Sequence, residues 1–209
     1  MSIEQLIANA KKLGFNEIYC ISDKDFGIEP EQMHNPVVRL AARGIIINND
    51  GKIGVMNKRV KNEFKLIGGG LEGAENFEEG FKRECLEEAG CEVDITKKLG
   101  YTVETKTCHV ENSEQKGWQQ LSLVVVAQTK NAQQELNLSR KEKDEDAVFL
   151  WLDPDEALKK MKGCINELRD SKYRNVYMSR FMVLRDIKIV EAYKALSQIP
   201  VANARENSR

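Results

Sequence analysis

The sequence has little histidine and no paired cysteine motif. It contains two histidines and five irregularly spaced cysteines, and no two of those cysteines form a Cys-x-x-Cys pair. An odd number of cysteines at such spacings argues against a disulfide framework. So few histidine and cysteine ligands also argue against a zinc site. Together these absences predict a reduced, cytoplasmic environment.

Long apolar segments and an excess of one charge are also missing. The longest strongly apolar run, LSLVVVA at residues 121–127, is too short to cross a bilayer, and the N-terminal residues lack the basic start of an export signal. The formal net charge is −1, whereas binding of duplex nucleic acid depends on a surface that neutralises phosphates. We therefore expect neither a membrane nor duplex nucleic acid as a partner. Small anionic ligands remain open.

The residues that are present follow the patterns of both strands and helices. Residues 3–13 repeat apolar side chains at helical spacing, and two β-rich runs within 37–58 flank a turn at Asn48–Gly51. Further strands are expected at 64–67, 93–104, 119–128 and 148–152, with helices from about Pro154 and over 176–196. This order predicts an α/β (α+β) fold. We expect a mixed sheet with helices on its faces, plus an N-terminal helix and a long C-terminal helix.

The chain length suits one main domain with additions at its ends. We expect an N-terminal helical extension over residues 1–36 that packs on the core, a main domain over 37–200 and a disordered tail over 201–209. The apolar stripe of the first helix could cover a sheet edge or join a dimer interface. The terminal helices thus offer apolar surface for a homodimer.

The stretch from Gly68 to Cys91 combines three glycines, expected to form a flexible loop, with a run dense in glutamate. On a helix, Glu84, Glu87 and Glu88 stand at positions i, i+3 and i+4 and converge on one face. Like charges at this spacing destabilise a helix by roughly 0.2–0.5 kcal/mol per pair, so an offsetting cation is expected. Carboxylate oxygens favour Mg²⁺ or Mn²⁺ over zinc. A solvated acidic face is the ordinary alternative.

The fixed positions of this stretch are Gly69, five residues, Glu75, seven residues, Arg83-Glu84-Cys85, one residue, Glu87-Glu88, one residue and Gly90-Cys91. This pattern resembles the Nudix box, the signature of the Nudix hydrolase superfamily. Weaker similarity extends to the hairpin that ends near Arg59 and to the passage at residues 149–161. The resemblance implies that residues 37–200 form a Nudix domain, a Nudix-type α/β/α sandwich.

The resemblance also implies roles for individual residues. Glu84, Glu87 and Glu88 would hold Mg²⁺ or Mn²⁺ together with the carbonyl of Gly69. Two further box residues, Glu75 and Arg83, would brace the loop and orient the ligating carboxylates. Water activated by the cation would then attack phosphorus in the diphosphate of a nucleoside diphosphate derivative.

The sequence pattern indicates the general base and the substrate contacts less clearly than it indicates the metal ligands. The base could be a box glutamate or a glutamate of the long loop before Trp151, where Glu142 and Glu145 are candidates and Glu145 is preferred. Trp118 is interpreted either as a base-stacking residue or as packing. A basic cluster before the glycines suits phosphates, and the substrate-binding residues expected here are Arg59, Lys65, Gly68 and Gly70.

These roles predict a Mg²⁺-dependent pyrophosphohydrolase, with a nucleoside triphosphate, an oxidised one included, as the preferred small-molecule substrate. Members of the superfamily also act on ADP-ribose, dinucleotides and nucleotide sugars, and the loops at 106–117 and 130–146 match no pattern that selects among them. Two alternatives stay open. One is a nucleotide sensor without turnover on the same fold, and the other is an acidic helix that serves only as an interaction surface.

Overall fold

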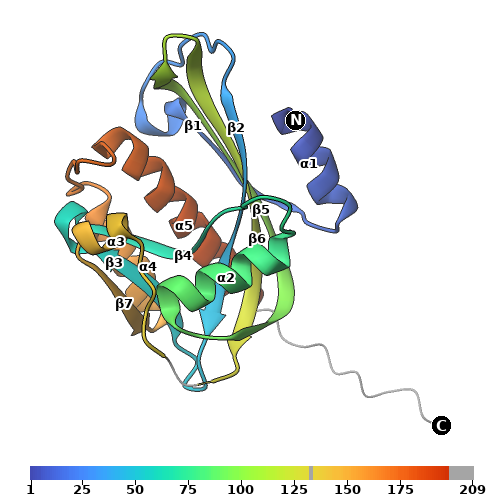
Figure 1. Ribbon diagram of the computed structural model, residues 1–209, viewed down its shortest axis with the longest axis vertical. Helices are drawn as coiled ribbons and strands as arrows, with labels where there is room; N and C mark the ends of the chain where they lie inside the picture. Colours follow the sequence, from blue (N-terminus) through green and yellow to red (C-terminus); the bar gives the residue numbers. More distant parts are fainter. Residues whose placement is uncertain (132–133, 198–209) are drawn as a thin grey trace.

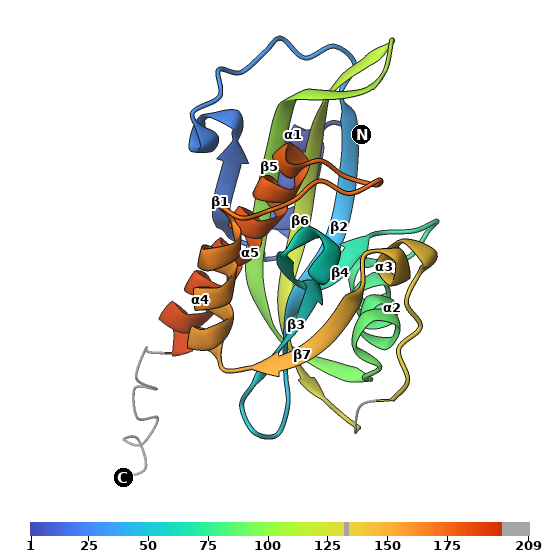
Figure 2. The same ribbon diagram turned by 90° about the vertical axis from the view of Figure 1, so that its left-hand side faces the viewer.

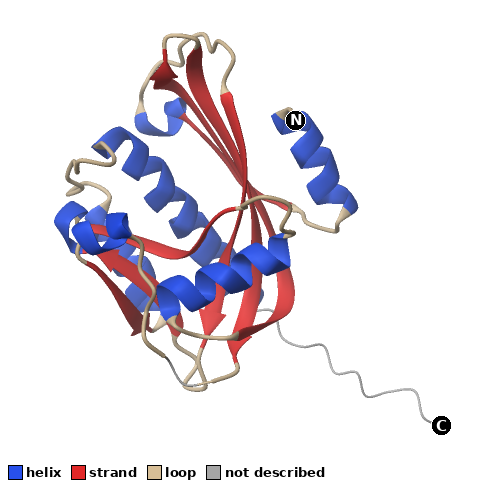
Figure 3. Cartoon of the chain, viewed as in Figure 1, coloured by secondary structure: helices blue, strands red, loops and turns tan. Residues whose placement is uncertain are grey.

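The computed structural model describes residues 1–131 and 134–197. Within them, one mixed seven-stranded sheet has the order β1-β5-β6-β2-β4-β3-β7 (Figures 1 and 3). Its strands are β1 (Glu17–Ser22), β2 (Val37–Ile47), β3 (Ile53–Lys58), β4 (Glu63–Gly70), β5 (Val93–Asn112), β6 (Gln115–Thr129) and β7 (Ala147–Leu152). The tail expected over 201–209 lies outside the described residues.

Helices cover both faces of this sheet. On one face lie α1 (Ile3–Lys12) and α2 (Phe77–Ala89), and on the other lie α4 (Pro154–Cys164) and α5 (Val176–Ser197), as Figures 1 and 2 show. The short helix α3 (Arg140–Asp144) precedes β7, and two single turns of 3₁₀ helix lie at Asp23–Phe26 and Arg59–Lys61. The predicted mixed α/β sandwich with helices near both ends is confirmed. No described helix is both long and apolar enough to cross a membrane.

Two apolar clusters fix these layers. Phe81 and Cys85 of α2 pack with Ile67 of β4 in one cluster, and Val183 and Ile187 of α5 belong to the cluster on the opposite face. Burying one such large side chain fully is worth roughly 1.5–3 kcal/mol relative to leaving it exposed. Both the helix that carries the glutamates and the C-terminal helix are thus held rigidly against the sheet.

The three glycines lie in a strand, so the expectation of a flexible loop at this point is wrong. Residues 63–66 of β4 pair with β3, and residues 67–70 pair with β2, so that Gly68 faces Arg43 and Gly70 faces Ala41. A Cβ atom at Gly68 would lie 2.4 Å from the carbonyl oxygen of Ala42, and its φ of +131° disfavours other residues. Glycine is needed here because β4 changes partner.

The N-terminal 36 residues contain more than the expected helix. Strand β1 pairs in parallel with β5 and forms an edge of the sheet. The fully buried Asp23 accepts hydrogen bonds from the backbone N–H and the hydroxyl of Thr107, at 2.8 and 2.6 Å, and from the hydroxyl of Tyr177 on α5, at 2.6 Å. The segment is therefore tied to both the sheet and the C-terminal helix.

The two segments expected as loops are partly regular. Residues 106–117 belong to a long hairpin in which β5 and β6 pair up to Asn112 and Gln115. The segment at 130–146 contains α3, whose N-cap Ser139 accepts a hydrogen bond from the backbone N–H of Glu142. Parts of both segments therefore belong to the regular structure beside the sheet.

Candidate active site

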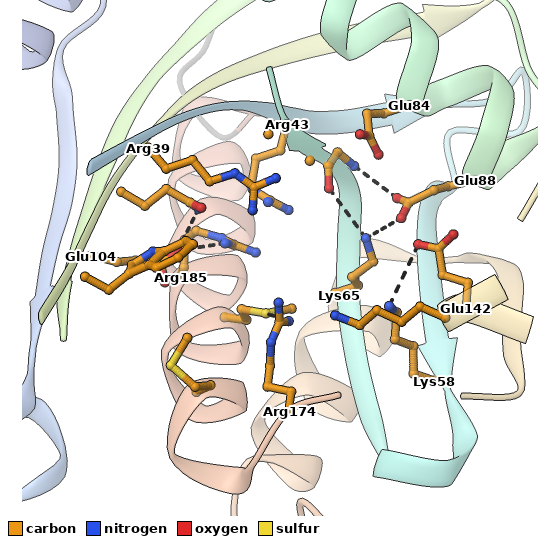
Figure 4. Close-up of a pocket in the computed structure, with 18 of the residues that line it drawn as sticks. Arg39, Arg43, Lys58, Lys65, Glu84, Glu88, Glu104, Glu142, Arg174 and Arg185 are labelled. Carbon is orange, nitrogen blue, oxygen red and sulfur yellow. Dashed lines mark hydrogen bonds and ion pairs between the residues drawn. The ribbon is translucent and has the colours of Figure 1, made fainter. Parts of the chain in front are cut away.

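A cavity of about 220 Å³ lies where β4 leaves β3 for β2, and its lining comes from segments distant in the sequence. Figure 4 shows two walls that face each other across it. We call one the carboxylate wall, formed by Glu84, Glu88 and Glu142 with Lys58 and Lys65. We call the other the arginine wall, formed by Arg39, Arg43, Lys106, Arg174 and Arg185 with Glu104.

Glu88 is the most buried member of the carboxylate wall, with 2% of its surface exposed. Its carboxylate accepts hydrogen bonds from the Lys65 ammonium at 2.6 Å and from the backbone N–H of Gly68 at 3.2 Å. Burial raises the pKa of Glu88 to about 7, against the pull of Lys65 and with further help from a hydrogen bond to Glu142. Its surroundings therefore favour the neutral form of Glu88 more than water does.

The pKa of Glu142 is shifted in the opposite direction from that of Glu88. Burial would raise its pKa, but the hydrogen bond with Glu88 and the nearby charges of Lys65 and Lys58 outweigh burial and lower the pKa to about 2. The Nζ atom of Lys58 lies 3.8 Å from the Glu142 carboxylate. Their contact thus shifts the pKa values of the two carboxyl groups in opposite directions, up for Glu88 and down for Glu142.

Glu84 lies directly against the glycine strand. A Cβ atom at Gly69 would be 2.3 Å from Glu84 Oε1, so only glycine allows this approach. Arg83 donates from one nitrogen to Glu84 at 2.9 Å and to Glu87 at 3.1 Å. Glu87 is half-buried and is absent from the cavity lining, so two of the three predicted metal ligands face the cavity.

Arg83 joins the helix to the loop before it. Its guanidinium donates two hydrogen bonds to Glu75, at 2.9 and 3.2 Å, and one to the carbonyl of Gly70, at 3.2 Å. The hydrogen bond to Glu75 is the largest factor that raises the pKa of Arg83. This is the arrangement of a bracing pair, the role implied for these two residues by the box.

A divalent cation would require some of these contacts to change. Among the residues that the structure describes, no three His, Cys, Asp or Glu side chains are grouped around a common point. The reason is that Lys65 holds Glu88 while Arg83 holds Glu84 and Glu87. The donors themselves suit a hard cation because all are oxygens.

Two other predicted residues lie away from the cavity. Glu145 is 1% exposed and accepts hydrogen bonds from Lys58 at 3.0 Å and Ser171 at 2.9 Å, and it is absent from the lining. The side chain of Arg59 is 56% exposed and lies 3.4 Å from Asp146, also outside the lining. Lys65, Gly68 and Gly70 do line the cavity, and their role in binding substrate stays a prediction.

Trp118 also lines the cavity and contacts His109 edge to face, with the ring centroids 5.3 Å apart. The choice between stacking on a base and packing stays a prediction.

Sequence reasoning missed the arginine wall. Arg185 on α5 donates to Glu104 on β5 and to Asp186, both at 2.7 Å, and Lys106 forms an ion pair with Glu104. Arg39 and Arg43 stand four residues apart on β2 and so share one face of the sheet. The sequence signals for this wall were two charged residues in apolar surroundings, Arg43 in strand β2 and Arg185 in helix α5.

A family model described as the NUDIX domain matches residues 37–170. The chain belongs to the Nudix family. This confirms the predicted family and the class of enzyme, a Nudix pyrophosphohydrolase acting on nucleotide derivatives. Nudix hydrolases generally use divalent metal cations. No curated protein matches the chain.

Solved structures of Nudix proteins resemble the chain at low sequence identity. One is a NUDIX hydrolase from Nitrosomonas europaea, with 16% identity and a TM-score of 0.49, covering 77% of this chain and 90% of that one. Another is the MutT protein from Methanosarcina mazei Go1, with 17% identity and a TM-score of 0.43, covering 78% and 97%. A third is an ADP-ribose pyrophosphatase from Streptococcus suis, with 16% identity and a TM-score of 0.43, covering 75% and 92%.

Proposed function

We propose that this Nudix protein is a Mg²⁺-dependent hydrolase that cleaves the diphosphate linkage of a nucleoside diphosphate derivative by attack of water on phosphorus. A nucleoside triphosphate, an oxidised one included, is the substrate that we favour. The observation that carries the proposal is that Glu84, Glu88 and Glu142 line one cavity beside the backbone of Gly68–Gly70. Carboxylates gathered beside a bare backbone suit a cation and a phosphate together.

Glu84, Glu88 and the carbonyl of Gly69 would hold Mg²⁺ or Mn²⁺, with Glu87 joining them once it leaves Arg83. When bound, the cation would withdraw charge from the phosphate oxygens and make a water molecule more acidic. For binding to occur, Lys65 must leave Glu88, and its ammonium is then free to pair with a phosphate. Lys65 would thus pair with Glu88 before the cation binds and with a substrate phosphate afterwards.

We propose Glu142 as the general base in place of Glu145, because Glu142 lines the cavity whereas Glu145 is bonded to Lys58 and Ser171. Glu142 is ionised at neutral pH and can accept a proton from the attacking water, and the contacts with Glu88 and Lys65 that lower its pKa change when Glu88 binds the cation. The new bond joins the water oxygen to phosphorus, and the bond from phosphorus to the bridging oxygen breaks. The bridging oxygen leaves with the bonding electrons on the departing phosphate.

The test is turnover by the purified protein with Mg²⁺ and a panel of nucleotides, comparing Glu84→Gln and Glu88→Gln with the wild type. Each substitution should lower kcat by about 10²–10³-fold, as loss of a preorganised electrostatic group does. Glu78→Gln is the matched control, since Glu78 is exposed on the same helix and does not line the cavity. It should leave kcat unchanged.

Unchanged turnover in both site variants would contradict the proposed site. Glu87→Gln tests whether Glu87 binds the cation. A fall in kcat similar to that of Glu84→Gln would show that it does. Nucleotide binding without any product would instead support a sensor on the Nudix fold.

A further inference from the structure

The arginine wall carries more positive charge than its own carboxylates neutralise. Glu104 accepts from Arg185 at 2.7 Å and from Gln120 at 3.3 Å and pairs with Lys106, while Asp186 accepts from Arg185 at 2.7 Å. Glu104, the acidic residue of the wall, and the neighbouring Asp186 are thereby paired with Arg185 and Lys106. Within residues 1–131 and 134–197, no acidic partner is found for Arg39, Arg43 or Arg174.

Arg43 is the decisive residue. Only 5% of its surface is exposed, it lines the cavity, and its Nε and Nη1 atoms have no hydrogen-bond partner among the described residues. Nη2 of the buried Arg185 likewise has none. A buried donor without a partner costs about 1–3 kcal/mol, and more when it is charged. An anion in the cavity would supply this guanidinium with the acceptors that the described residues do not provide.

The neighbouring cations repel one another. Burial lowers the pKa of Arg43 to about 10, and the charge of Arg185 adds to this effect, although nearby carboxylates, Asp186 first, oppose it. Burial also lowers the pKa of Arg39 and Arg174 adds to it, against the opposing charge of Glu84. Arg39 lies flat against the strand, since a Cβ at Gly70 would be 2.2 Å from its Nε atom. An anion between these groups would add attraction where the carboxylates offset the repulsion only in part.

We propose that the arginine wall is a second anion subsite, which holds a phosphate group of the substrate in addition to the two phosphates of the anhydride that is cleaved. The inference rests on the proposed function, because it places that anhydride at the carboxylate wall. Phosphate is the anion that fits: it carries up to two charges and several oxygens, and guanidinium groups bind it in pairs of hydrogen bonds. Substrates with a third phosphate are therefore preferred over those with only two.

Binding can be tested without turnover. Wild-type protein in EDTA is titrated with inorganic tripolyphosphate by calorimetry, beside Arg43→Met, Arg43→Lys and the matched control Arg140→Met, whose native side chain is 91% exposed. Losing hydrogen bonds to a charged group should weaken binding by roughly 10–100-fold in Arg43→Met. Arg43→Lys should recover part of the affinity, and Arg140→Met should bind as the wild type. Wild-type affinity in a folded Arg43→Met protein would overturn the subsite.

Two pairs of nucleotides, whose members differ by one phosphate, then identify the source of the third phosphate. A nucleoside triphosphate is compared with its diphosphate, and NADPH with NADH, by kcat/KM with Mg²⁺. At least one pair should show about tenfold or greater preference for the extra phosphate, and Arg43→Met should remove it. A preference that survives in Arg43→Met, or no preference in either pair, contradicts the subsite.

The two proposals fail in different ways. If no nucleotide is hydrolysed but tripolyphosphate still binds through Arg43, the proposed function is wrong and the subsite stands. If nucleotides are hydrolysed but tripolyphosphate binding does not depend on Arg43, the subsite is wrong and the proposed function stands.

Discussion

The two walls of the cavity neutralise their charges differently. On the carboxylate wall every glutamate has a cation at hand, Lys65 for Glu88, Arg83 for Glu84 and Lys58 for Glu142. On the arginine wall Arg43 keeps buried nitrogen atoms without partners within the described part of the chain. We therefore expect the first wall to rearrange when it binds a ligand. We expect an anion to stabilise the second without such a rearrangement.

The largest effect expected from this contrast is on the carboxylate that holds the arginine wall together. Glu104→Gln leaves Arg185 and Lys106 buried with weaker partners, since both ion-pair with this 1% exposed carboxylate. Removing one partner of a buried charge network costs about 3–5 kcal/mol in the free energy of unfolding. Urea unfolding measures the change. A loss below about 1 kcal/mol would mean that water reaches the network.

Acid should reproduce part of that loss in the wild type. Burial would raise the pKa of Glu104, but Lys106 and Arg185 outweigh burial and lower it well below the usual range. A group with a lowered pKa stabilises the fold above its unfolded pKa, about 4.3 for Glu, and loses this contribution as the pH falls through its folded pKa. The difference in unfolding free energy between wild type and Glu104→Gln should therefore shrink below about pH 4. A constant difference would exclude Glu104 as the cause.

Gly69→Ala tests the contact between the glycine strand and the carboxylate wall. The added Cβ would lie 2.3 Å from Glu84 Oε1, so the glutamate must move while the backbone can stay extended. A displacement of about 1 Å at a catalytic group can cost roughly 10²-fold in rate, and we expect kcat to fall by about that factor. Circular dichroism should show an intact fold. Gly163→Ala, where a Cβ meets open space, is the control.

Lys65→Met removes the cation that holds Glu88. Because Glu88 can take up a proton near pH 7, the loss in unfolding free energy should be only about 1–3 kcal/mol. Mg²⁺ should restore most of it, since a cation bound to the folded state stabilises that state. Thermal melting with and without Mg²⁺ measures this, with Lys82→Met as the exposed control on α2. No additional Mg²⁺ effect in the variant would argue against a cation at Glu88.

Arg59→Ala should have the smallest effect. Its ion pair with Asp146 is exposed on both sides, at 56% and 59%, and such pairs contribute about 0–1 kcal/mol. Since Arg59 does not line the cavity, we expect an unchanged KM for the nucleotide. A clear rise in KM would restore the substrate-binding role that the sequence suggested for it.

The sequence predicts the parts of the molecule that depend on local pattern. The turn at Asn48–Gly51, the amphipathic α2 and the start of α4 after Asp153 follow from residues close to each other in the chain. Box residues were predicted because their spacing along one helix is fixed. The position of Glu84 and Glu88 at one cavity could thus be anticipated from the sequence.

The arginine wall could not be predicted in this way, because its meaning depends on distant partners. Arg185 meets Glu104 across 81 positions, and the two are joined only once β5 and α5 pack together. Lys65 was expected to bind substrate, yet its contact with Glu88 spans 23 positions and depends on the path of β4. Strand β1 was missed because its short, half-exposed residues show no clear alternation.

The buried carboxylate of Asp23 has a practical consequence for any shortened version of this protein. It connects the N-terminal segment to Thr107 on the long hairpin and to Tyr177 on the helix that carries Arg185. A chain that starts at Val37 keeps every residue of the box yet loses this anchor, an edge strand and α1, which packs in the same apolar cluster as α2. We therefore expect trimming to the recognisable domain to loosen both walls of the cavity, the arginine wall through α5 and the carboxylate wall through α2.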